Sequence, residues 1–234
     1  MIAIGNFDGL HLGHQALLKL PNTIVYTFTP HPRRAPRLMS DAQKAKALRD
    51  FGVKQVIFQE FTLEFAALSP EDFIQKILIE QLNATDIVVG PDFAFGAEAS
   101  GDVKTLQKDT RFKTHIIEPV RILGKICSSS LIREAISKGD LERAKAFLAH
   151  DYSLTGTVVR GAGRGRKIGF PTANLEVEQE VLPPFGVYAV YSKSLGQGVT
   201  NIGKQPTFGS ENPVRVETHF LDFNGSLYGE EIEI

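Results

Sequence analysis

Residues 5–14, Gly-Asn-Phe-Asp-Gly-Leu-His-Leu-Gly-His, combine a glycine-rich turn with two histidines directly behind an apolar segment at residues 1–4. His11 and His14 are three positions apart, so they fall on one face of the first turn of a helix. Free N–H groups and the helix dipole favour an anion there, and glycines let the backbone approach a ligand. The segment therefore predicts a phosphate site. The alternatives are a metal pair, for which no third ligand stands at a familiar spacing, and ordinary surface histidines.

Three further segments carry side chains suited to nucleotide binding. Residues 27–32 end a predicted strand in a proline-rich loop containing His31, and residues 88–96 end another with Phe93 and Phe95. In an open parallel sheet, ligands bind at this carboxyl edge. Residues 128–133, Ser-Ser-Ser-Leu-Ile-Arg, place hydroxyls at a helix start and Arg133 in its first turn, which suits phosphates. Taken singly, these side chains are equally typical of loops, core and helix caps.

Composition narrows the class of protein. The chain has 234 residues, of which 42% are hydrophobic, and this is enough for one large domain or two modest ones. A formal net charge of -1 gives no indication of a nucleic-acid or membrane surface. The single cysteine, Cys127, rules out an intrachain disulfide and indicates a reducing compartment. No apolar run approaches the ~20 residues of a membrane span, and no signal peptide is evident, so a cytoplasmic protein is expected.

The pattern along the chain predicts two halves. Up to about residue 150, short apolar runs alternate with helical periodicity, which indicates a Rossmann-like α/β domain with a parallel sheet. Its expected strands are residues 1–4, 24–28, 55–58, 86–89 and 114–117. After about residue 151 the runs shorten between Gly and Pro, which predicts a small antiparallel β-barrel. Its expected strands are residues 154–159, 186–191, 199–202, 215–220 and 231–234.

Helix starts can be read from capping signals. Ser69-Pro70 precedes two acids and an apolar face, and Ser40 with Gln43 forms the pattern of a capping box. A helix over residues 131–138 is expected to end at Gly139, and Asp140 is expected to cap the next helix, through residue 148. We therefore place the domain boundary near residues 149–152, behind the last helix.

The chain resembles the FMN adenylyltransferase half of the bifunctional bacterial FAD synthetases over nearly all of its first 150 residues. The resemblance is carried by the four segments described first, at residues 5–14, 27–32, 88–96 and 128–133. The resemblance implies that His11 and His14 act on the triphosphate of ATP, with Ser128, Ser129 and Arg133 on the departing pyrophosphate. It further implies an ATP pocket shaped by Asn6, Phe7, Asp8 and Gly9, and flavin or adenine contacts at Asp92, Phe93 and Phe95. Two positions depart from the family pattern: Leu131 stands where an arginine is usual, and Pro91 where a glutamate is common.

The second half resembles the riboflavin kinases. Residues 156–166 form a basic glycine-rich loop that lacks the spacing of a dinucleotide fingerprint or a P-loop and could equally touch RNA. Residues 171–174, Pro-Thr-Ala-Asn, match the sharper motif of that family, followed by segments near residues 186–189, 201–208 and 216–219. The resemblance implies that Thr172 and Asn174 hold Mg²⁺ and phosphate, that Gly163 and Arg166 contact ATP, and that Glu217 is the general base.

The sequence is therefore interpreted as a bifunctional enzyme that phosphorylates riboflavin to FMN and adenylylates FMN to FAD, using ATP and Mg²⁺. Its expected partners are these small molecules, with no nucleic acid or membrane and with the oligomeric state undetermined. The alternatives are an adenylyltransferase whose barrel is structural or flavin-binding, and a non-catalytic nucleotide- or RNA-binding module. Because riboflavin kinases usually continue beyond the strand at residues 231–234, the second half is expected to be C-terminally incomplete, with a marginal kinase.

Overall fold

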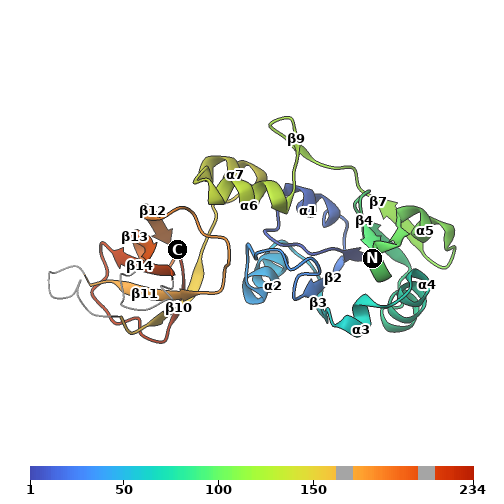
Figure 1. The fold of residues 1–234 in the computed structure, drawn as a ribbon, viewed down its shortest axis with the longest axis horizontal. Coiled ribbons are helices and arrows are strands. Elements are labelled where there is room, and N and C mark those ends of the chain that lie inside the picture. Colours follow the sequence, from blue (N-terminus) through green and yellow to red (C-terminus); the bar gives the residue numbers. More distant parts are fainter. Residues whose placement is uncertain (162–170, 205–213) are drawn as a thin grey trace.

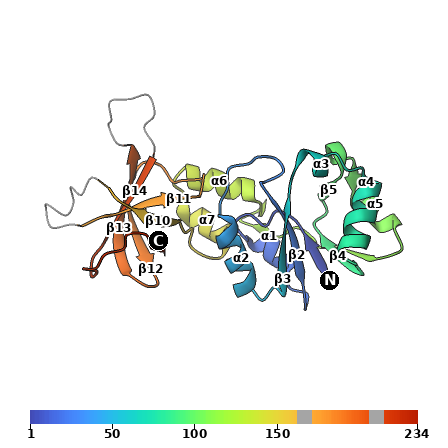
Figure 2. The ribbon, with the colours of Figure 1, turned by 90° about the horizontal axis from the view of Figure 1, so that it is seen from below.

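The computed structural model describes residues 1–161, 171–204 and 214–234. Figures 1 and 2 show two halves lying end to end, the first built of helices and strands and the second of strands alone. Two helices, α6 (Ser129–Ser137) and α7 (Leu141–Leu148), lie between the halves. Both sequence-based expectations of fold class, an α/β half followed by an antiparallel β half, are confirmed.

A five-stranded parallel sheet forms the centre of the first half, in the order β3-β2-β1-β4-β7. Its strands are β1 (Ile2–Ile4), β2 (Ile24–Thr29), β3 (Gln55–Glu60), β4 (Asp86–Val89) and β7 (Lys113–Ile116), each within two residues of its predicted bounds. All three residues of β1 are buried because the strand has neighbours on both sides and helices over both faces. From β1 the chain builds the sheet outward on one side through β2 and β3. It then crosses back and adds β4 and β7 on the other side of β1.

Alternation along the strands divides the core into two layers. Ile2 and Ile4 pack on one side of the sheet with residues of η1 (Phe73–Gln81), whereas Ala3 packs on the other side with Leu17 and Leu48. Those two leucines belong to α1 (Leu12–Leu17) and α2 (Asp41–Asp50). The remaining helical segments of this half are α3 (Leu63–Ala66), α4 (Pro70–Asp72), η2 (Ala97–Ala99) and α5 (Val103–Lys108).

The predicted helix caps are present. Ser40 and Gln43 form a complete capping box, Ser69 accepts the amide of Asp72, and Asp140 accepts the amide of Arg143. Gly139, with φ of 77°, follows α6 in the left-handed conformation that favours glycine. The type of one helix differs from expectation, because residues 73–81 form a π-helix.

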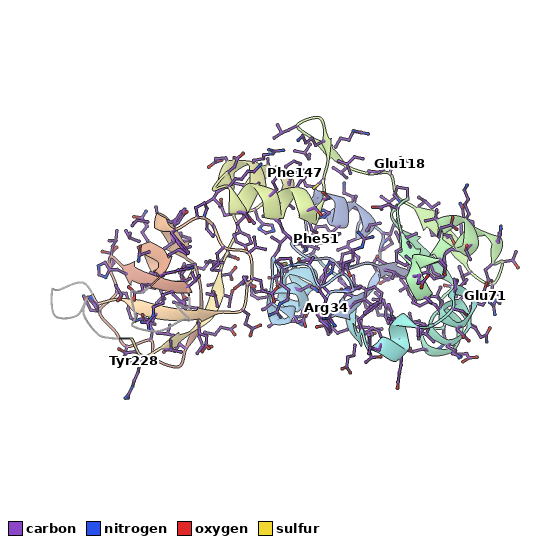
Figure 3. The ribbon with its side chains drawn as sticks, viewed as in Figure 1. Arg34, Phe51, Glu71, Glu118, Phe147 and Tyr228 are labelled. Carbon is purple, nitrogen blue, oxygen red and sulfur yellow. The ribbon has the colours of Figure 1, made fainter. Side chains whose placement is uncertain are left out.

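Two short hairpins complete the first half. They are formed by β5 (Ala94–Phe95) with β6 (Gly101–Asp102), and by β8 (Arg121–Ile122) with β9 (Lys125–Ile126). Cys127 is a buried free thiol that donates to the carbonyl of Phe147, and Phe147 is itself buried in the helical region between the halves (Figure 3).

The second half is a six-stranded antiparallel sheet in the order β12-β13-β14-β11-β10-β15. Its strands are β10 (Thr155–Val159), β11 (Ala173–Val177), β12 (Gly186–Ser192), β13 (Gly196–Lys204), β14 (Val214–Phe220) and β15 (Glu231–Glu233). Burial alternates along β13 and β14, as a sheet with one covered face requires. The covered face packs Leu175, Ile202, Val216 and Ile232 into one cluster.

Candidate active sites in the two halves

The order of the parallel sheet determines where a ligand can enter the first half. Strand β1 pairs with β2 on one side and with β4 on the other, so the order of the strands changes direction between β1 and β4. In open parallel sheets, ligands bind outside the carboxyl ends of the strands at such a point. Residues 5–14, called the loop after β1 below, comprise the turn that leaves β1 and the first residues of α1, which begins at Leu12. The hydroxyl of Thr27 on β2 donates to the carbonyl of Asn6 at 3.0 Å, which ties this loop to the neighbouring strand.

His11 and His14 lie together, as their spacing predicted. His11 is the N-cap of α1: its Nδ1 accepts the backbone N–H of His14 at 3.2 Å. The two rings stack with centroids 3.6 Å apart and 15° between their planes. Because Nδ1 of His11 is an acceptor, the proton of its neutral ring is on Nε2. This nitrogen is therefore a donor available to a ligand.

Both histidines are neutral at pH 7. Burial, with a smaller effect from Arg133, lowers the pKa of His11 to about 4. Burial also holds the pKa of His14 well below its usual value, and His11, Lys44 and Arg133 add to this effect. The two rings are therefore neutral, and Lys44 and Arg133 make their surrounding electropositive.

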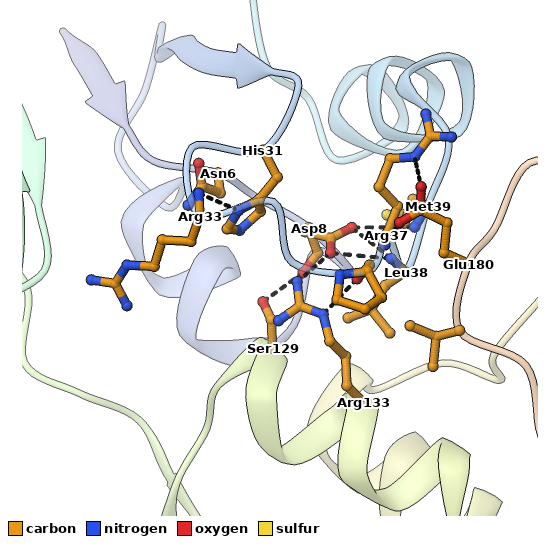
Figure 4. Close-up of polar contacts among 12 residues, drawn as sticks. Asn6, Asp8, His31, Arg33, Arg37, Leu38, Met39, Ser129, Arg133 and Glu180 are labelled. Atoms are coloured by element: carbon orange, nitrogen blue, oxygen red, sulfur yellow. Dashed lines mark hydrogen bonds and ion pairs between the residues drawn. The ribbon is translucent and has the colours of Figure 1, made fainter. Parts of the chain in front are cut away.

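Asp8 connects this loop to two distant segments (Figure 4). Its carboxylate accepts the amides of Leu38 and Met39 at 3.0 and 3.2 Å, and it pairs with Arg133 Nη2 at 2.7 Å. Asp8 is 3% exposed and Arg133 is partly buried, so this ion pair, formed by residues 125 positions apart, is largely shielded from solvent. The hydroxyl of Ser129 donates to the carbonyl of Asp8 at 2.9 Å. Two of the segments predicted to share the site thus meet at this residue.

Arg133 is also held by the loop between β2 and α2, where its Nε donates to the carbonyl of Pro36 at 2.7 Å. Within the described residues Nη1 has no hydrogen-bond partner, so one edge of the guanidinium is left for a ligand. Ser128, which precedes Ser129, is the N-cap of α6. Leu131 packs on the apolar cluster around that helix. An apolar side chain therefore occupies the position where the family pattern has an arginine.

The glycines of the loop serve protein contacts. Gly9 has φ of 84°, and a Cβ there would lie 2.9 Å from Leu38 Cδ1. A Cβ on Gly13 would lie 3.0 Å from Cε1 of His11. At these two positions the close neighbour is thus the side chain of Leu38 or His11.

Two polar atoms of the same loop lack partners. Nδ1 of His14 and Oδ1 of Asn6 are buried and make no hydrogen bond within the described residues. Such orphaned atoms call for an explanation, and a polar ligand supplies one. Phe7, fully buried in one cluster with Ala3 of β1, has its ring centroid 5.2 Å from that of His14.

The loop after β4 holds the residues predicted to contact flavin or adenine. Phe95 is 6% exposed in the core and stacks on Phe93 at 5.7 Å, while Phe93 is partly buried. Asp92 and Pro91 are exposed. Phe95 therefore supports Phe93 from inside, and the ligand roles of Asp92, Phe93 and Phe95 stay predictions.

Sequence reasoning overlooked Lys44. This lysine is 6% exposed on α2, with Nζ 3.6 Å from Asp41 Oδ1 and 5.7 Å from the ring centroid of Phe58. Burial lowers the pKa of Lys44, against the opposing effects of Asp41 and Asp8. The sequence feature that could have revealed this buried lysine is its position one turn before Leu48, on the apolar face of the helix.

His31, predicted to lie in the loop after β2, accepts a hydrogen bond at Nδ1 from the amide of Arg33 at 3.1 Å (Figure 4). Its pKa is lowered mainly by burial.

The second half brings together Asn174 and Glu217. They are direct partners across β11 and β14, and Glu217 is also the direct partner of Asn201 on β13. Directly opposed residues of an antiparallel pair project from the same face, so three polar side chains share one face of the sheet. Glu217 is partly buried and Asn201 is exposed.

Asn174 has an orphaned oxygen. Its Oδ1 is buried without a hydrogen-bond partner within the described residues, and its amide lies against Gly161 so closely that no Cβ would fit there. Thr172 is partly buried at the start of the same segment, where the carbonyl of Pro171 accepts a hydrogen bond from Nδ1 of His219 at 2.8 Å. Gly163 and Arg166, predicted to contact ATP, lie outside the described residues. No group of three His, Cys, Asp or Glu side chains suited to a metal occurs in the described part of the chain.

The fold and these constellations define a nucleotide-using transferase with an α/β half and a β half. The family models agree with this: residues 1–131 match FAD synthetase, and residues 148–234 match riboflavin kinase. Bifunctional riboflavin kinase/FMN adenylyltransferases from Listeria monocytogenes and Escherichia coli are each 37% identical to the chain, over 100% of it and 82% of their own length. The Bacillus subtilis enzyme of the same name is 36% identical with the same coverage.

The chain belongs to the bifunctional riboflavin kinase/FMN adenylyltransferase family. It carries both transferase domains of FAD biosynthesis, in which FMN and then FAD are made, so this prediction is confirmed. A solved structure titled a macrolide-efflux protein from Streptococcus pneumoniae superposes with a TM-score of 0.85 at 30% identity, covering 99% of this chain and 83% of that one. Within the described residues, no helix combines the length and apolar composition that crossing a membrane requires.

Proposed function

We propose that the two reactions take place at two separate sites, one in each half, with residue roles as the sequence predicted them. The observation that carries this proposal is that unpartnered polar atoms lie in both halves, at Asn6 and His14 in one and at Asn174 in the other. The domain boundary near residues 149–152 is part of the proposal, since α7 ends at Leu148 and β10 begins at Thr155.

In adenylyl transfer, a phosphate oxygen of FMN attacks the α-phosphorus of ATP, and pyrophosphate leaves with the electrons of the broken P–O bond. This reaction requires alignment and charge stabilisation but no covalent nucleophile. Neutral Nε2–H of His11 and the His14 ring donate to the triphosphate, and the free edge of Arg133 contacts the departing pyrophosphate. The positive charges of Lys44 and Arg133, which lower the pKa of His14, support a polyanionic ligand at this place.

In riboflavin phosphorylation, the terminal ribityl hydroxyl attacks the γ-phosphorus of ATP and loses its proton, and ADP leaves with the electrons of the broken P–O bond. Glu217 takes that proton, because a carboxylate within hydrogen-bond reach is the natural base. Its partial burial opposite Asn174 and Asn201 supports this role, since the two amides can orient a polar substrate beside the carboxylate.

Mg²⁺ fits the second site. The orphaned Oδ1 of Asn174 is a hard oxygen of the type that Mg²⁺ prefers, and Thr172 begins the same segment. We assign these two residues to the ion, which when bound neutralises phosphate charge. ATP as a substrate and a single buried free cysteine support a cytoplasmic location.

The experiment that tests the function incubates the protein with riboflavin, ATP and Mg²⁺ and separates FMN from FAD by chromatography. The expected result is FMN followed by FAD. FAD from supplied FMN, with no FMN from riboflavin, would leave only the adenylyltransferase. A protein that forms neither product would be a binding module.

A further inference from the structure

The loop at residues 36–39 holds the two charged residues of the first site. Within these four residues, the amides of Leu38 and Met39 donate to the Asp8 carboxylate, and the carbonyl of Pro36 accepts from Arg133 Nε. Three backbone groups of one short loop thus fix the ion pair of Asp8 and Arg133. A displacement of this loop would move both side chains.

The remaining residue of the loop, Arg37, faces the other half of the protein. Its amide donates to Glu180 Oε2 at 3.0 Å, and its carbonyl accepts the amide of Glu180 at 3.2 Å. Its side chain lies 3.5 Å from Glu180 Oε1 through Nε and donates to the carbonyl of Glu178 at 3.2 Å through Nη2. Figure 4 shows Arg37 and Glu180 on the side of the loop away from Arg33. Main chain and side chain of Arg37 are both engaged by residues 178–181.

The segment at residues 178–181 is itself firmly placed. Val181 is 4% exposed and belongs to the same apolar cluster as Leu38, together with residues of α6 and α7. The hydroxyl of Tyr152 donates to the carbonyl of Val181 at 2.8 Å. An open groove of about 500 Å³ runs beside the contact and is lined from both halves, by Pro36, Arg133 and Ser137 and by residues 180–185 with Val214.

We propose that Glu180 and Arg37 are positioning residues for adenylyl transfer, through which the riboflavin kinase half holds the loop at residues 36–39 against Asp8 and Arg133. This inference rests on the proposed role of Arg133 toward pyrophosphate. The ion pair is itself half-exposed and contributes little stability. Its effect is geometric, because small displacements of aligned groups slow a reaction strongly, with roughly a hundredfold loss for about 1 Å.

The test compares Glu180→Ala with Glu134→Ala. Glu134 lies on α6 beside Arg133, is similarly exposed and makes a surface pair with Lys138, so it controls for the loss of a surface carboxylate. For Glu180→Ala, we expect kcat for FAD formation from FMN to fall roughly three- to tenfold, with the KM for FMN unchanged. Riboflavin phosphorylation, the reaction of the half that contains Glu180, stays at the parental rate. Glu180→Gln keeps an oxygen for the Arg37 amide and restores most of the loss.

A second measurement shows whether the effect passes through the loop. Amide hydrogen exchange at Leu38 and Met39 is expected to accelerate in Glu180→Ala and to match the parent in Glu134→Ala. In a protein that already carries Arg133→Lys, Glu180→Ala is expected to slow FAD formation by a smaller factor than it does in the parent protein. The reason is that both changes disturb one network. Unchanged FAD formation in Glu180→Ala, or equal loss of both activities, overturns the inference. A parent protein that makes no FAD from FMN contradicts the proposed function instead.

Discussion

The two sites differ in how their polar groups are held. In the α/β half, Asp8 binds Arg133 and two backbone amides, and Ser129 donates to its carbonyl. The two histidines are stacked and neutral. In the β half, Asn174 and Glu217 meet on one face of a sheet, and Glu217 is only partly buried. The difference fits the chemistry that we propose for each half. Adenylyl transfer needs fixed donors and no proton transfer, whereas phosphorylation of a hydroxyl needs a base that can change its protonation state.

The largest expected effect comes from removing that base. Glu217→Gln keeps the shape of the side chain, so we expect riboflavin phosphorylation to fall by roughly 10²- to 10⁴-fold. FAD formation from supplied FMN stays at the parental rate, because that site lies in the other half. Product analysis by chromatography measures both rates in one preparation. Equal loss of both would indicate a shared site or unfolding.

His14→Ala is expected to produce the reverse pattern. Loss of a well-placed donor to a developing charge costs about 2.7 to 4 kcal/mol of barrier, which is a hundredfold or more in the rate of FAD formation from FMN. Phosphorylation of riboflavin is unaffected. If the purified variant makes FAD at the parental rate, His14 does not act on the triphosphate.

Arg133→Lys sharpens the comparison in the first half. Lysine keeps the charge but cannot contact Asp8, Pro36 and a ligand from one planar group. We expect a KM for ATP in FAD formation that is raised roughly tenfold, the size of one lost charged hydrogen bond. Arg143→Lys on α7 is the matched control, since Arg143 lies over the ring of Phe147 at 5.9 Å. An unaltered dependence on ATP concentration would mean that Arg133 has only a structural role.

The smallest expected effect is on stability. His11 has a pKa of about 4 in the folded protein, below that of the unfolded chain, so the unfolded chain takes up a proton first as pH falls. Stability is therefore lost as pH falls from about 6.5 toward 4, and His11 alone should remove about 1 kcal/mol between pH 7 and pH 5.5. Denaturant titrations at several pH values check this.

His11→Asn should flatten that slope while keeping the helix cap, because asparagine also accepts at this position. His150→Asn, which changes an exposed histidine, is the control. A pH slope that His11→Asn leaves unchanged would show that His11 does not titrate below its unfolded value.

Much of the fold could be predicted because it is encoded locally. Four of the five parallel strands are built on short apolar runs, and the caps at Ser40, Ser69 and Asp140 are set by the side chains at those positions. The stacked histidines follow from their spacing. The π-helix at Phe73–Gln81 was missed because its hydrogen-bond register leaves the apolar pattern of a helix in place. The strand β11 was missed because its residues were interpreted only as a motif.

The network around Asp8 could be predicted only in part. The sequence placed Asp8 and Arg133 in one site but not in one ion pair, because the pairing depends on how α6 returns to the sheet. Arg37 and Glu180 are 143 positions apart, and neither belongs to a motif. Lys44 is a charged residue on an apolar helix face. Whether such a residue is buried in a site depends on partners from neighbouring strands, which its own segment does not encode.

A mixing experiment tests most directly whether the two chemistries occupy separate sites. His14→Ala and Glu217→Gln proteins are incubated with riboflavin, ATP and Mg²⁺, each alone and then together, and FMN and FAD are followed by chromatography. We predict that the first variant alone accumulates FMN and the second alone makes neither product. The mixture makes FAD, because FMN released by one protein is adenylylated by the other. The contradicting result is that each variant alone has lost both reactions and that the mixture forms no FAD. That result would mean that the two chemistries do not occupy separate sites.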